Sequence, residues 1–85
     1  MKPYFIHAEW DNEAGVWVAT SDGVPGLVAE SETIEALVLK LKLRVPELLA
    51  ANGIDAGGDV PFELLTRHYK VAHAVGHRGG FFTQT

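Results

Sequence analysis

One stretch of the sequence decides the fold: residues 9–37 read EWDNEAGVWVATSDGVPGLVAESETIEAL. The segment that leads into it, residues 4–10, alternates between two sets of side chains with the period of two that is typical of a strand. A polar turn follows at residues 11–15. Residues 16–20, VWVAT, are rich in the β-branched and aromatic residues that favour extended backbone. The sequence therefore predicts a β-hairpin at the start of the chain.

The second half of the same stretch predicts a corner, a short third strand and the start of a helix. Pro25 fixes φ and Gly26 accepts a positive φ, so the pair predicts a turn. Residues 27–30 are short and apolar enough for the third strand. Thr33 is the predicted N-cap of the helix, with Ser31 as the alternative, because a hydroxyl oxygen can accept from the free N–H groups of the first turn.

A helix is predicted over residues 33–51, ending at Asn52 and Gly53. Residues 39–45 alternate strictly, as a strand would, but Leu and Lys are strong helix formers and the run is too short to override the longer helical pattern. Pro46 removes a backbone donor, so we expect either a kink or a break into two helices near Val45. The predicted buried face has helical spacing and comprises Ile34, Leu37, Val38, Leu41, Val45, Leu48 and Leu49.

The remaining sequence predicts one more strand and then a loop. Residues 60–71 alternate as a long final strand, and the last dozen residues are rich in glycine. We therefore expect one α+β domain over residues 1–72, with a flexible C-terminal tail over residues 73–85. Its elements follow the order β-β-β-α-β, with an antiparallel-rich sheet and one helix, kinked or broken at Pro46, packed on one face.

Composition limits the classes of protein that fit. Eighty-five residues, 47% of them apolar, with mixed charge, describe one small globular domain. The absence of cysteine excludes disulfides and thiol chemistry, and no apolar run reaches the roughly 18 residues that a membrane span needs. The first ten residues include an acid and a histidine, which a signal peptide would lack. We expect a cytoplasmic protein that does not enter membranes.

Charge is distributed unevenly along the chain. All eleven acids lie in residues 1–63 with four bases, which gives −7, whereas residues 64–85 hold three bases and no acid, which gives +3. The net charge of −4 argues against a nucleic-acid-binding domain. Three bases are also few for contact with phosphates. We expect the basic end to pair with the acidic body of the same fold or of a second copy.

The order of these motifs resembles that of HicB-type antitoxin domains, and especially of small proteins that carry a HicB-like domain alone. The resemblance covers about residues 4–71 and rests on turns, caps and core positions. The motifs that carry it, besides the acidic-aromatic Glu9, Trp10 and Asp11, are EAGVWVA at 13–19, VPGL at 24–27, ETIEAL at 32–37, VPELL at 45–49 and VPFEL at 60–64.

The resemblance implies a partial RNase H-like fold and a role in neutralising a small mRNA-cleaving toxin by protein–protein contact. Such antitoxins commonly oligomerise, so we expect a homo-oligomer, either a dimer or a larger assembly. Many also carry a DNA-binding domain, but the sequence after Val71 is too short for a helix-turn-helix or ribbon-helix-helix module, and we expect no direct DNA binding. The alternative is a structural homo-oligomer without a toxin partner.

Carboxylates near the first turn offer a different, metal-dependent chemistry. Glu9, Asp11 and Glu13 form an acidic cluster, and a full RNase H fold holds Mg²⁺ with strand-borne carboxylates. We prefer a solvated turn in which Asp11 binds its own backbone, because no second strand clearly brings another acid to the cluster.

The C-terminal histidines offer a second metal hypothesis. His68, His73 and His77 are spaced by five and four residues, and the last two could share a helical face as zinc ligands. Glycine at position 76 and the lack of cysteine speak against it. We therefore expect no catalytic residue, no cofactor and no metal, with a small metal-binding protein or nuclease as the alternative.

Candidate interface residues come from the helix, the hairpin and the last strand: Leu39, Leu43, Trp10, Trp17 and His68. At about 100° per residue, the two leucines fall opposite the main apolar face of the helix, where a single-sheet fold should meet water. The two tryptophans face each other across the hairpin, which predicts packing unless one lies on the face away from the helix. His68 is a candidate interface residue on the last strand.

Overall fold

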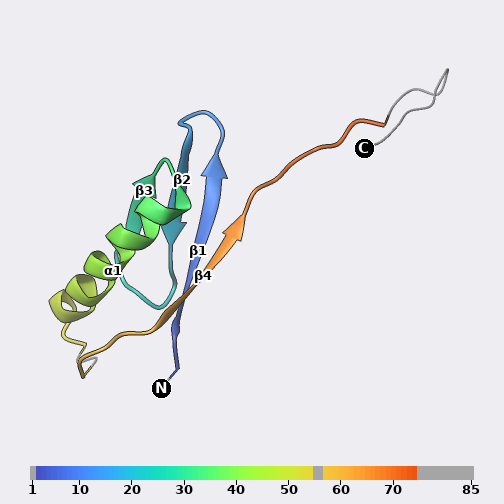
Figure 1. Cartoon of the computed structure of the whole chain (residues 1–85). Coiled ribbons are helices and arrows are strands. Elements are labelled where there is room, and N and C mark those ends of the chain that lie inside the picture. Colours follow the sequence, from blue (N-terminus) through green and yellow to red (C-terminus); the bar gives the residue numbers. More distant parts are fainter. Residues whose placement is uncertain (1, 55–56, 75–85) are drawn as a thin grey trace.

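The computed structural model describes residues 2–54 and 57–74. Their elements are β1 (Tyr4–Asp11), β2 (Val16–Thr20), β3 (Val28–Ser31), α1 (Ile34–Ala51) and β4 (Phe62–Arg67) (Figure 1). The strands form one sheet in the order β3-β2-β1-β4. β2 pairs antiparallel with both β1 and β3, whereas β4 pairs parallel with β1. The predicted α+β class and the β-β-β-α-β order are confirmed.

One face of the sheet is covered by α1, which packs against β3 and β2. Four helix residues, each four positions from the next, are fully buried there, which confirms the predicted face: Leu37, Leu41, Val45 and Leu49. They meet small and branched side chains from the strands and the corner, namely Ile6, Ala8, Ala19, Val24, Leu27 and Ala29. Each buried leucine contributes about 1.5–3 kcal/mol by removal from water.

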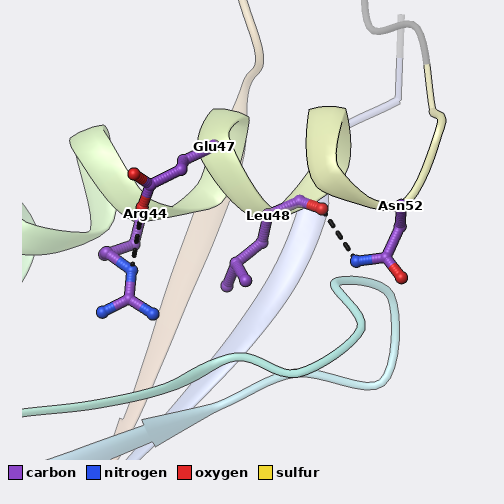
Figure 2. Close-up of polar contacts among 4 residues, drawn as sticks. All are labelled: Arg44, Glu47, Leu48 and Asn52. Carbon is purple, nitrogen blue, oxygen red and sulfur yellow. Dashed lines mark hydrogen bonds and ion pairs between the residues drawn. The ribbon is translucent and has the colours of Figure 1, made fainter.

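Both ends of α1 are capped by the predicted residues. The Thr33 hydroxyl accepts a hydrogen bond from the Ala36 N–H at 3.1 Å. Ser31, the alternative cap, lies in β3, and its buried hydroxyl has no hydrogen-bond partner among the described residues. At the other end, the Asn52 side-chain amide donates to the Leu48 carbonyl at 2.8 Å (Figure 2), and Gly53 has a positive φ of 73°.

The helix continues through Pro46 as a single element, so of the two expected alternatives, a kink or a break into two helices, the break does not occur. Proline cannot donate to the carbonyl of Lys42, four residues earlier. Both residues lie on the exposed side of α1, where water can bind that carbonyl. The buried side of the helix keeps its packing, and this contact with the sheet outweighs the lost hydrogen bond.

The predicted bounds of three strands were wrong. β1 ends at Asp11, one residue later than expected. The third strand covers Val28–Ser31, one residue later than expected. The last strand covers only Phe62–Arg67, although alternation continues to residue 71. Its ladder partner is β1, and the pairing ends at Glu9 and Arg67, although β1 itself runs on to Asp11. Most of the expected tail, from residue 75 on, lies outside the described residues.

Candidate functional site

The outer side of α1 carries two exposed leucines. Leu39 is 65% exposed and Leu43 is 75% exposed, and they lie one turn apart. The same i, i+4 spacing extends the row by one acid at each end, which gives an outer stripe of Glu35, Leu39, Leu43 and Glu47. The predicted second apolar surface on the helix is therefore present, and acidic side chains flank it at both ends.

A groove runs beside this stripe, between α1 and the outer edge of β3. Its lining comprises Val28, Ala29, Glu30, Lys40, Leu43 and Arg44. The Lys40 ammonium donates to the backbone carbonyl of Glu30, so the helix partly covers the edge of the sheet. Arg44 forms an ion pair with Glu47, Nε to Oε1 at 3.2 Å (Figure 2). This pair is largely exposed and contributes little to stability. An apolar centre within a charged rim is the usual organisation of a protein interface.

The other three candidate residues meet in an aromatic cluster on the helix-bearing side of the sheet. Trp10 and Trp17 face each other across the hairpin with ring centroids 5.4 Å apart, edge to face. The His68 ring lies 5.4 Å from Trp10 and 5.2 Å from Trp17. The predicted cross-strand packing is confirmed. Because neither tryptophan lies on the opposite face, the condition for a binding anchor is not met.

The acidic residues near the first turn form a structural turn. One carboxylate oxygen of Asp11 accepts from the backbone N–H groups of Glu13, at 3.0 Å, and Ala14, at 3.1 Å. Gly15 completes the turn with a φ of 69°. This confirms the predicted backbone bonding of Asp11. Glu9 is paired with Arg67 on the neighbouring strand, β4.

The structure brings no metal-ligating group together in the part of the chain that it describes. Within residues 2–54 and 57–74, no three His, Cys, Asp or Glu side chains lie close enough to hold a metal ion. His73 is exposed, and His77 lies outside the described residues. In the same ranges, no helix is both long and apolar enough to cross a membrane.

Sequence reasoning missed the helix-free face of the sheet. Exposed or half-buried apolar side chains from each of the four strands lie on it: Phe5, Val18, Val28 and Leu65. The alternation of residues 4–10 had assigned Phe5 to this side. The other three could be added only once the register joined the strands, because periodicity within one strand says nothing about its neighbours.

The comparisons with known proteins place the chain in a family. A sequence model described as "Domain of unknown function (DUF1902)" matches residues 3–74. The chain belongs to the DUF1902 family. It is similar to the crystal structure of the hypothetical protein TTHA1013 from the extremely thermophilic bacterium Thermus thermophilus, with 44% sequence identity and a TM-score of 0.65. The match covers 86% of the present chain and 100% of that one. A search of curated proteins gave no match.

Membership of DUF1902 establishes the fold family and leaves activity open. The match spans the whole region in which the sequence resembles HicB-type domains, about residues 4–71. Neither the family description nor that of the thermophile protein mentions an antitoxin. The finer assignment to HicB-type antitoxins is therefore treated as a proposal.

Proposed function

We propose that this protein is a non-enzymatic binding domain that neutralises a small mRNA-cleaving toxin by contact through the outer stripe of α1. The observation that carries the proposal is the exposure of Leu39 and Leu43 on a helix whose opposite face already fills the core. Exposed apolar side chains that adjoin one another on a rigid helix lower their free energy when a partner covers them.

Charge favours a basic partner. A protein that cleaves mRNA has to bind a phosphate backbone, and it does so with Lys and Arg side chains. The acids at the two ends of the stripe, Glu35 and Glu47, would meet such side chains around a central apolar contact, and the net charge of −7 in residues 1–63 would speed the encounter. A stretch of toxin covered in this way could no longer reach RNA.

The test uses the product of the reading frame next to this gene as the candidate partner. Titration calorimetry measures its binding to the full chain, and an RNA-cleavage assay measures its inhibition. The double variant Leu39→Glu, Leu43→Glu should bind at least tenfold more weakly and fail to inhibit cleavage, while its circular dichroism spectrum stays unchanged.

The matched control is Lys42→Glu, which changes the net charge by the same two units at another exposed position of α1. It should keep binding within a few fold. Equal binding by the double variant and the native chain would refute the stripe as the contact. An adjacent frame whose product neither binds nor cleaves RNA would favour a structural homo-oligomer without a toxin partner.

A further inference from the structure

The chain continues beyond β4 as an extended arm, residues 69–74, that runs away from the body of the domain (Figure 1). Its side chains are exposed, with Tyr69 at 80% and Val71 at 60%. Within the described residues, the arm takes part in no strand ladder and no hydrogen bond. It also contains Lys70 and His73 but no acid. An extended segment with free backbone groups and exposed apolar side chains is suited to pairing with another strand.

The root of the arm is fixed. His68 packs on Trp10 and Trp17, and these contacts set the direction in which the following residues leave the sheet. β1 pairs with β4 as far as Glu9–Arg67 and itself ends at Asp11, so no strand of its own sheet lies beside residues 70–74. The basic arm therefore does not lie along the acidic body of its own copy.

The open edge of the sheet, at β4, is suited to pairing with such an arm. β4 is an outer strand, and in the described part of the chain only β1 pairs with it. On the helix-free face, this edge carries Glu63 and Leu65, the latter 49% exposed. By alternation, Tyr69, Val71 and His73 lie on the same face as Glu63, Leu65 and Arg67.

We propose that residues 69–74 pair antiparallel with the outer edge of β4 in a second copy of this chain, and that the second copy does the same in return. Such a dimer is symmetric, because the same patch serves both copies. The two sheets then join along their β4 strands and arms into one continuous sheet. The contact lies at the opposite edge of the sheet from β3, so the outer stripe of α1 takes no part in it.

The side chains select one register. In a two-fold pair centred on His68, residues equally far before and after it face each other. Val71 then faces Leu65, and His73 faces Glu63, so an apolar pair and a pair of acid and base are formed. A centre one residue earlier would place two Arg67 side chains directly opposite each other, which like-charge repulsion disfavours.

The first test is the mass of the native chain in solution by sedimentation equilibrium. We expect a dimer, and a monomeric native chain would overturn the proposal. The Tyr4 N–H donates to the Pro61 carbonyl, so odd residues of β4 bond to β1 and even ones, such as Leu64, point to the open edge. Ala72 faces Leu64 in the proposed register, so Ala72→Pro removes a donor to the second copy and should give a monomer with unchanged circular dichroism. The pair Leu39→Glu, Leu43→Glu should stay dimeric, which separates this contact from the proposed partner site. A dimeric Ala72→Pro variant would also refute the proposal.

The second test fixes the register, and it is clean because the native chain has no cysteine. Facing residues of an antiparallel pair have Cα atoms about 4.5–5.5 Å apart, within reach of a disulfide. The double variant Leu65→Cys, Val71→Cys should form disulfide-linked dimers under mild oxidation. The two positions cannot link within one copy, since six residues of extended chain span about 20 Å. Leu65→Cys, Tyr69→Cys is the control, and preferential linking there would overturn the register.

Discussion

Residues 39–45 of α1 alternate between buried and exposed leucines, and a matched pair of substitutions tests this assignment. Leu41 is fully buried against the sheet, whereas Leu43 is mostly exposed two residues later. Leu41→Ala removes the same atoms as Leu43→Ala, but it also leaves a cavity in the core. Buried leucines lose about 2–5 kcal/mol on truncation, so we expect Leu41→Ala to lower the free energy of unfolding by about 3 kcal/mol. Leu43→Ala should change it by less than about 0.5 kcal/mol.

Urea unfolding of the two variants, followed by tryptophan fluorescence, gives both free energies of unfolding. The dependence of this free energy on urea concentration should be the same for both variants. For a domain of this size, a loss of about 3 kcal/mol corresponds to a fall in Tm of about 12–24 °C. Measurements at several protein concentrations separate folding from association. Equal destabilisation by the two substitutions would refute the reasoning, because Leu43 would then have to be buried within a single copy.

Two further predictions concern the backbone of α1. Thr33→Ala should lower the free energy of unfolding by about 1 kcal/mol, because the Ala36 N–H loses its cap, and Thr33→Ser should restore most of the loss in the same urea titration. An undiminished stability in Thr33→Ala would show that water replaces the hydroxyl without cost. Pro46→Ala should raise the free energy of unfolding by about 1–2 kcal/mol, and with it the melting temperature. The alanine returns a backbone donor to the Lys42 carbonyl in a helix that is already continuous. A lower melting temperature would mean that proline stabilises this turn.

The elements set by nearby residues could be predicted from the sequence. The turn at Asp11, the cap at Thr33 and the glycine after the helix each depend on a few neighbouring residues, and the structure has them as expected. The end of β4 was not predictable in this way, because it depends on where β1 stops pairing. Pro46 is a similar case, since packing against the sheet outweighs a local preference for a break.

In the candidate site too, features set by nearby residues could be predicted and contacts between distant segments could not. Helical periodicity was enough to place Leu39 and Leu43 on the exposed side of α1. The meeting of His68 with the two tryptophans could not be foreseen, because it joins the end of β4 to a hairpin more than fifty residues earlier. The last strand was expected to continue to residue 71, and the departure of the chain from the body became visible only in the structure, where pairing with β1 stops at Arg67 although β1 runs on to Asp11.

The contact between Lys40 and the Glu30 carbonyl bears on solubility. A sheet with two open edges can add copies without limit, and such growth leads to fibres or precipitates. Here β3 is only four residues long, and a lysine from α1 occupies one of its outward carbonyls. A strand that approached this side would have to displace a charged side chain. Growth at that edge is hindered, so the proposed pairing along β4 would give closed pairs rather than chains.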